Sequence, residues 1–401
     1  MSWGAGNPLD WGWYSFFDDL LSHRFYSLGA PSKEPIRTPM RQLRTHFAKS
    51  LLGALLVSAA AADTIYTIDG DTIEDVTVRA EELSTVTYRT AGSKKDKTVS
   101  ADQVLRVNFS SKPALIDSAD SAVEDGAYFP AINDLEEFLV NGAKEARKFP
   151  WAKAYSVYRV MEINLLIGEY EDAVKAADRV LADAGESRYV PLAHLGKARA
   201  LFDSGKAADA TAAVATLKEL ADSGKVGARW GLEAEVHQVL FNADLKGSAR
   251  VTKLTGLVTR AANDFSIVAN RARVAAGEAS VTVKDYAGAE KFFRAVLDEP
   301  QADSRTLAGA YSGLGNCLYA QAEGAGSDGA ELYREALMAY MRVVVNYELE
   351  FAYVPHSMLY AGLCFRGMGG EEDLERATVM LLRVRQRFPG SREAEEAKSL
   401  R

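Results

Sequence analysis

The stretch that decides the fold is Gly126-Ala-Tyr-Phe-Pro-Ala131, because its spacing of glycine, aromatic residue and alanine returns along the chain. It recurs as Gly168-Glu-Tyr-Glu-Asp-Ala173 and, with alanine for the aromatic, as Gly205-Lys-Ala-Ala-Asp-Ala210. Weaker copies end on Ala249, Ala289, Ala336 and Ala377. Successive alanines are 37 to 47 residues apart, which is typical of stacked helical repeats with a concave binding surface.

The composition is that of an ordinary globular chain and argues against nucleic acid as the main partner. The 401 residues are 48% hydrophobic and 25% charged, with a formal net charge of −8. Residues 1–62 are slightly basic, so the remainder is the more acidic part. Binding to phosphates needs a basic stripe, which this balance does not favour.

Residues 40–62 have the pattern of a secretory signal peptide, with a basic start, an apolar run and the small residues Ala60-Ala-Ala62 at its end. The apolar run is too short to span a bilayer, which takes about 20 residues. The alternative is a buried helix. We expect cleavage after Ala62 and a periplasmic or extracellular protein. Residues 1–39 precede the signal, so we interpret them as a mis-annotated extension with translation starting at Met40; a genuine extension is the alternative.

Residues 63–110 predict a small β module of four or five strands, which is similar to SH3-like or Sm-like folds. The expected strands are 64–68, 72–79, 83–88 and 104–109, with a further short one near Val99. Asp69-Gly70 between the first two is a turn signal. Asp69 and Asp71 resemble a fragment of a metal loop, but the rest of a calcium loop is missing, so we expect a hairpin. Residues 110–113 are the expected linker.

From residue 114 to 401 the apolar spacing is helical, and the repeats resemble the tetratricopeptide repeat (TPR) family. Leu314-Gly-Asn-Cys-Leu318 matches the first helix of that family's unit, and Tyr286 to Phe293, with Pro300 after it, matches the second. The end of the chain, around Arg387-Phe-Pro-Gly-Ser391, is similar to repeats of bacterial envelope proteins of the outer-membrane assembly lipoprotein and cell-division coordinator type. The resemblance implies an α-solenoid of about seven helix pairs.

Two units depart from this pattern. The unit around Ala249 has Lys246 and Lys253 where apolar residues are expected, and Glu323-Gly-Ala-Gly-Ser-Asp-Gly329 predicts a flexible loop inside the unit around Ala336. Cys317 and Cys364 occupy equivalent places in successive units, so we interpret them as small buried residues, with a disulfide as the alternative.

The resemblance to TPR proteins implies that the first helix of each pair lines a concave groove that binds partner proteins or peptides. In this register the groove residues are Tyr155, Tyr158, Glu162, Arg199, Phe202, Gln238, Phe241, Asn242, Arg271, Glu278, Asn316, Tyr319, His356 and Arg366. Aromatic anchors mixed with hydrogen-bonding groups suit protein recognition. The alternative is that the aromatic ones pack between repeats.

The sequence contains no recognisable catalytic pattern. The histidines form no metal-binding pair on a helix, and neither a nucleophile elbow nor a phosphate loop is present. We therefore expect a non-catalytic scaffold without cofactor or metal, whose partners are proteins or peptides. One alternative is a structural protein of the cell envelope that associates with itself. A second is a glycan-binding or enzyme-associated envelope protein.

Overall fold

The computed structural model describes residues 62–400. The expected signal peptide, except for its last residue Ala62, and the expected extension 1–39 lie outside the described residues. Within the described part, none of the helices is both long and apolar enough to cross a membrane.

The described chain begins with an antiparallel sheet of five strands, which confirms the predicted β module. The strands are β1 (Asp63–Thr67), β2 (Thr72–Glu81), β3 (Thr85–Thr90), β4 (Lys97–Ser100) and β5 (Val104–Asn108). Their order is β4-β3-β2-β1-β5, so the chain meanders and its last strand returns beside the first. Gly70 has a φ of 82° in the turn between β1 and β2, a conformation that glycine adopts without strain. The Asp69–Asp71 segment is thus the expected hairpin turn.

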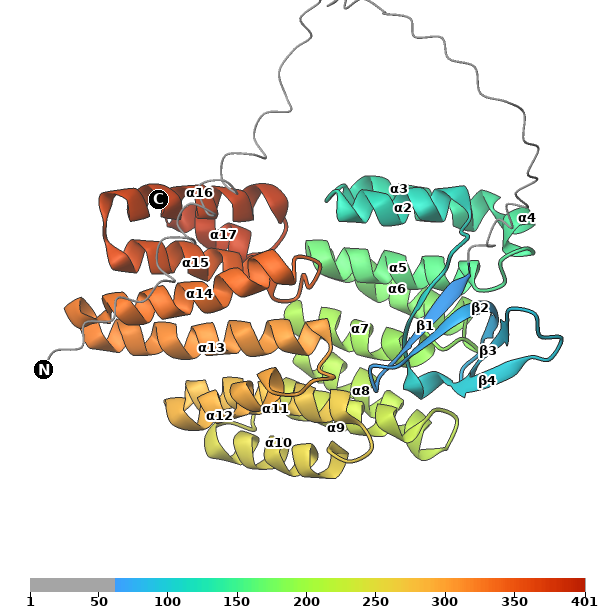
Figure 1. The fold of residues 1–401 in the computed structure, drawn as a ribbon, viewed down its shortest axis with the longest axis horizontal. Coiled ribbons are helices and arrows are strands. Elements are labelled where there is room, and N and C mark those ends of the chain that lie inside the picture. Colours follow the sequence, from blue (N-terminus) through green and yellow to red (C-terminus); the bar gives the residue numbers. More distant parts are fainter. Residues whose placement is uncertain (1–61, 401) are drawn as a thin grey trace, which may run out of the picture. The chain divides into compact units, whose positions relative to one another are not determined.

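Seven helix pairs follow the sheet in the described residues, and Figure 1 shows them stacked side by side, which confirms a TPR-like α-solenoid. The pairs are α2 (Ala114–Glu124) with α3 (Tyr128–Asn141), α5 (Ala152–Ile167) with α6 (Tyr170–Asp183), α7 (Val190–Asp203) with α8 (Ala207–Asp222), α9 (Ala228–Phe241) with α10 (Gly247–Ala261), α11 (Ser266–Thr282) with α12 (Tyr286–Leu297), α13 (Ser304–Ala325) with α14 (Ala330–Asn346), and α15 (Val354–Met368) with α16 (Glu371–Arg387). The short α4 (Ala143–Ala146) follows α3, and α17 (Arg392–Ser399) follows the last pair.

The repeat alanines are buried where two helices of a pair approach each other. Ala131, Ala173, Ala210, Ala289 and Ala336 are completely buried, and Ala377 is 1% exposed. A methyl group is the largest side chain that such close contacts admit, which explains the recurring alanine. Ala249 is the exception, because it is exposed on α10, which instead buries Leu254, Leu257 and Ala261.

Glycines in the first helices make room for large rings from the second helices. A Cβ atom at Gly277 would lie 2.6 Å from the ring of Phe293, and one at Gly313 would lie 2.2 Å from the same ring. Phe293 itself is completely buried. These two glycines therefore let the Phe293 ring pack directly against the backbones of α11 and α13.

The segment Glu323–Gly329 is not the flexible loop that its glycines predicted. Helix α13 continues through Ala325, and a single 3-10 turn, η2 (Gly326–Gly329), leads directly into α14. Gly326 has a φ of 58° and changes the chain direction there. The insertion thus lengthens α13 rather than forming a loop. Cys317 and Cys364 are buried and free, as expected for small core residues.

Buried charges fix the sheet to the helices. The carboxylate of Glu81 on β2 forms an ion pair with Arg188, just before α7, and both side chains are almost completely buried. The Tyr189 hydroxyl donates a 2.9 Å hydrogen bond to the same carboxylate. A second link joins Arg229 on α9, whose guanidinium donates to the Asp102 carbonyl at 2.9 Å. The sheet and the array therefore form one packed body.

Candidate functional site on the inner face of the array

The first helices of the pairs are buried on more sides than the second helices. Helix α11 contacts α9, α10, α12 and α13, and buried residues occupy almost every position from Ile267 to Ser280. Helix α6 instead buries one stripe of four residues. We call the groove residues that the sequence predicted on α5, α7, α9, α11, α13 and α15, together with Glu233 and His237 of α9, the inner face.

The middle of the inner face contains a buried carboxylate between two arginines. Glu233 on α9 is completely buried; Arg271 on α11 forms an ion pair with its Oε1, and Arg229 Nε lies 3.7 Å from the same atom. Burial alone would raise the pKa of Glu233, but the two guanidinium groups outweigh it and lower that pKa. His237, one turn along, places Nδ1 2.8 Å from the Glu233 carbonyl, and burial lowers its pKa.

About two helical turns after Arg271, the same helix carries an acid that has no ion pair among the described residues. Glu278 on α11 is exposed, and none of the described basic groups lies within ion-pair distance of it. The surrounding inner face nevertheless removes much of its water, and this desolvation raises the pKa of Glu278 to about 7, with Arg199 of α7 opposing the shift. Arg199 is itself paired with Asp203. Burial raises the pKa of Tyr353, which precedes α15, to about 12. The charge of Glu278 adds to this shift, and the charges of Arg305 and Arg199 oppose it.

Aromatic side chains cluster at the other end of the inner face. Asn316 Oδ1 on α13 accepts a 2.7 Å hydrogen bond from the Tyr340 hydroxyl and lies 2.8 Å from His356 Nε2. Tyr360 lies 4.3 Å from the His356 ring and 5.1 Å from that of Tyr319, centroid to centroid. The predicted residues Asn316, Tyr319 and His356 therefore do meet. All three are half-buried: Asn316 contacts His356 directly, and Tyr360 connects Tyr319 to His356.

This cluster predicts that stability depends on pH. Burial, with help from Arg392, lowers the pKa of His356 from 6.5 to about 4, so the folded state binds fewer protons than the unfolded state between these values. The stabilising contribution is present above pH 6.5 and is lost as the pH falls toward 4, a change of up to about 3 kcal/mol. Urea unfolding at several pH values should show this slope in the wild type, and a His356→Gln variant should flatten it. Equal slopes in both proteins would contradict the assignment.

The predicted residues of α5 are occupied by contacts within the array. The Tyr155 hydroxyl donates to Asp120 at 2.9 Å, and the Tyr158 hydroxyl donates to Glu162 at 2.6 Å. Glu162 also pairs with Arg159 at 2.9 Å. Tyr155, Tyr158 and Glu162 are half-buried, so for them the alternative of packing between repeats describes the structure better than an open groove.

Among the remaining predicted residues, some side chains are exposed and others make contacts within the array. Phe202 is 36% exposed at the end of α7 and stacks on Phe241, with ring centroids 4.7 Å apart. Phe241 is only 4% exposed, against the expectation of an inner-face position, because it packs into the core between α7, α8 and α9. Asn242 accepts backbone hydrogen bonds in the turn before α10, and Arg366 donates to the Leu400 carbonyl at the end of α17.

Gln238 and Asn242 line a separate hollow of about 430 Å³ between α9 and α10. The predicted set is thus not one continuous groove. Its exposed members are Arg199, Phe202, Asn242, Glu278 and Arg366. Sequence reasoning missed Glu233 and His237, although their spacing of four residues on one helix places them on the same face as Phe241. It also missed Tyr353, whose loop gives no periodic signal.

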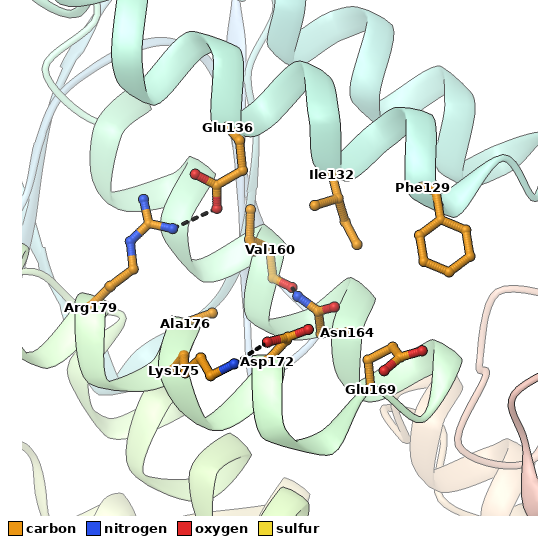
Figure 2. A pocket seen from close by; sticks show the side chains of 10 residues that line it. All are labelled: Phe129, Ile132, Glu136, Val160, Asn164, Glu169, Asp172, Lys175, Ala176 and Arg179. Atoms are coloured by element: carbon orange, nitrogen blue, oxygen red, sulfur yellow. Dashed lines mark hydrogen bonds and ion pairs between the residues drawn. The ribbon is translucent and has the colours of Figure 1, made fainter.

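Another hollow, of about 480 Å³, lies between α3 and the pair α5–α6, and Figure 2 shows the side chains around it. Phe129, which is 60% exposed, and Ile132 border it from α3, while Val160 and Asn164 form its floor. An ion pair of 2.5 Å between Glu136 and Arg179 spans one side (Figure 2). None of the predicted groove residues lines this hollow.

The described residues contain no group of three or more histidine, cysteine or acidic side chains placed to hold a metal ion. The predicted positions on these helices carry aromatic, cationic and anionic side chains instead.

No protein-family model matches the chain, and no curated protein matches it. Among solved structures, it is similar to the crystal structure of a tetratricopeptide repeat protein from Parabacteroides merdae, with 15% sequence identity and a TM-score of 0.39. That alignment covers 71% of this chain and 95% of the other. The description of the array as TPR-like therefore rests on its own helix pairs, repeat alanines and glycines.

Proposed function

We propose that this protein is an exported, non-catalytic scaffold that binds a segment of a partner protein on the inner face of its helical array. The observation that carries the proposal is the exposure of Arg199 and Phe202 on α7 and of Glu278 on α11, with Arg199 near enough to oppose the pKa shift of Glu278. Partner recognition commonly depends on an aromatic anchor with charged neighbours.

The chemistry of this surface indicates what a partner segment supplies. Phe202 offers an apolar ring, and Glu278 is a carboxylate that has no ion pair within residues 62–400 and has lost much of its water. A lysine or arginine of the partner would replace that water and favour the ionised form of Glu278. We therefore infer that the partner segment carries a basic residue next to an apolar one.

The sequence of residues 40–62 supports the export part of the proposal. Strand β1 starts at Asp63, the residue after the proposed cleavage point. The Asp63 carboxylate accepts hydrogen bonds from the backbone of Val78 and Ser110, both at 2.9 Å. Cleavage after Ala62 would leave these bonds intact. Mass spectrometry of the native N-terminus tests this part, and peptides from residues 1–39 would contradict it.

The binding site is tested by cross-linking residues 63–401 to proteins of the native envelope and identifying the products by mass spectrometry. Phe202→Ala should reduce the yield of partner cross-links about tenfold, since losing a central aromatic anchor costs about 1–2 kcal/mol of binding. Tyr319→Ala tests the aromatic cluster in the same way. The melting temperature of each variant must stay close to that of the wild type for the result to concern binding.

A control is Phe129→Ala, which removes a ring of the same size, more exposed than Phe202, from the hollow on α3 and should leave the partner cross-links unchanged. Equal yields of partner cross-links from the wild type and the Phe202→Ala variant would contradict the inner-face site.

One observation favours self-association as a second function: Phe129 and Val140 on α3 are 60% and 75% exposed. Light scattering over a range of concentrations tests that function, and a constant monomer mass would exclude it.

A further inference from the structure

The hollow between α3 and the pair α5–α6 is bordered by apolar side chains from three helices (Figure 2). Phe129 and Ile132 project from α3, while Val160 lies on α5 and Ala176 on α6. Val160 and Ala176 are buried, so the packed core holds them in place. The volume of about 480 Å³ lies within the range of about 300–1,000 Å³ that is typical of small-molecule sites. The hollow is therefore large enough for a small organic molecule with an apolar part.

One polar side chain at the floor of this hollow is almost completely buried and has an unused acceptor. Asn164 is 6% exposed. Its Nδ2 donates a 2.9 Å hydrogen bond to the Val160 carbonyl, one turn earlier on α5 (Figure 2). Its Oδ1 accepts no hydrogen bond from the described residues, yet this oxygen is not sealed from solvent. Because Asn164 lines the hollow, its Oδ1 is available to a hydrogen-bond donor bound there.

The charged side chains around the hollow leave one carboxylate without a partner. Glu136 pairs with Arg179 at 2.5 Å, and Asp172 pairs with Lys175 at 2.7 Å (Figure 2). Glu169 is exposed and has no ion pair among the described residues. Three acids and two bases thus line the hollow, a net charge of −1. Because both bases are already paired with acids, the charge that remains to be neutralised there is negative.

The turn between α5 and α6 fixes the two unused acceptors relative to each other. Gly168 ends α5 with a φ of 81°, a conformation that glycine adopts without strain. The backbone amide of Glu169 then donates a 2.9 Å hydrogen bond to the Asn164 carbonyl. Asn164 and Glu169 are therefore held together within one turn of the chain. A site that is fixed before the ligand arrives loses less conformational entropy when it binds.

We propose that this hollow binds a small organic cation, a protonated amine with an apolar body, independently of partner binding on the inner face. The ammonium group donates a hydrogen bond to Asn164 Oδ1 and neutralises the Glu169 carboxylate, while the apolar body covers Phe129 and Ile132. A carboxylate or phosphate in the same place would be repelled by Glu169. A molecule without a donor would leave Asn164 Oδ1 desolvated and unpaired, which costs binding energy.

The test compares three probes of similar shape and different charge. Phenethylamine is cationic at pH 7, phenethyl alcohol is neutral, and phenylpropionate is anionic. Each is titrated against residues 63–401, and its binding is followed by ligand-observed NMR. We expect phenethylamine to bind saturably with a Kd below about 1 mM, as the size of so small a ligand allows. The other two probes should bind at least about tenfold more weakly.

Substitutions of the two acceptors locate the binding. Asn164→Leu removes the Oδ1 acceptor while keeping a side chain of similar size, and it should raise the Kd of phenethylamine about tenfold. Glu169→Gln removes the unpaired charge and should raise that Kd about threefold. Glu171→Gln is the matched control, because Glu171 is an exposed acid on the first turn of α6 that does not line the hollow. It removes the same charge and should leave the Kd unchanged.

Equal affinities for phenethylamine and phenethyl alcohol would overturn the proposal, and so would a lack of saturable binding by phenethylamine. Equal losses from Glu169→Gln and Glu171→Gln would also overturn it, because the cation would then be attracted to the acidic surface in general. If Asn164→Leu does not fold, Phe129→Ala takes its place, since that ring is exposed; it should raise the Kd about threefold, and an unchanged Kd would count against the hollow.

Discussion

Replacing Arg188 by methionine should destabilise the protein by about 3–5 kcal/mol, because it leaves a buried carboxylate without its charge partner. Glu81 has a side chain that is 1% exposed, and Arg188 is its only ion-pair partner among the described residues. The Tyr189 hydroxyl would remain as a single 2.9 Å hydrogen bond, too little to replace the guanidinium. The carboxyl must then take up a proton or admit water, and either change weakens the joint between sheet and array.

Urea unfolding followed by circular dichroism measures this cost. The double variant Glu81→Met with Arg188→Met should recover most of the lost stability, since it removes both charges and fills the space with apolar atoms. Lys175→Met breaks the exposed pair with Asp172 and should change stability by less than about 0.5 kcal/mol. If Arg188→Met costs no more than Lys175→Met, the buried pair does not hold the joint.

The sequence predicted the array because its signals are local. The repeat alanines mark contacts between helices that follow each other in the chain, and a turn glycine such as Gly168 stands next to the alanine whose burial it makes possible. Spacing alone therefore located the helix pairs and the buried faces. The strands were predictable for the same reason, since β1 and β2 are joined by a short turn at Gly70.

Predictions were wrong where tertiary contacts overrule local signals. The glycines of Glu323–Gly329 indicated a loop, yet α13 continues to Ala325 and a single turn completes the connection. Ala249 has the repeat spacing, but α10 begins at Gly247 and places that alanine on its exposed side. In both places, contacts with neighbouring helices decide where the helix begins or ends and which side it buries. The identity of a single residue carries no information about those contacts.

The candidate site was only partly predictable, because its character depends on partners far apart in the sequence. Arg199 and Glu278 are exposed, as their positions in the helical register predicted. It placed Phe241 on the inner face, although that ring is in the core. Arg188 and Glu81 are 107 residues apart, and Gly168, at the end of α5 in the second pair, packs against Gly390, which follows the last pair. No periodicity within a helix encodes such pairs.

Replacing Phe293 by alanine should also destabilise the protein by about 3–5 kcal/mol, because it empties a site that the backbone cannot fill. The ring is completely buried between α11, α12 and α13, and Gly277 and Gly313 leave it the space that their own side chains would take. Removing the ring leaves a cavity lined by two bare helix backbones. Phe129→Ala, on an exposed ring of the same size, should cost less than about 1 kcal/mol in the same urea unfolding experiment.

Because the Phe293 ring occupies the space next to Gly313, we expect the destabilising substitutions Phe293→Ala and Gly313→Ala to compensate each other. Gly313→Ala alone places a methyl group 2.2 Å from the Phe293 ring and should cost about 1–3 kcal/mol through overpacking. In the Phe293→Ala background the ring is gone, so the added methyl group occupies part of the cavity and improves the helix propensity of α13. Gly313→Ala should then be neutral or stabilising, giving a coupling energy of at least about 1 kcal/mol in a double-mutant cycle. Additive costs would mean that Gly313 is present for a reason other than the ring, and that the close contact between α12 and α13 does not depend on glycine.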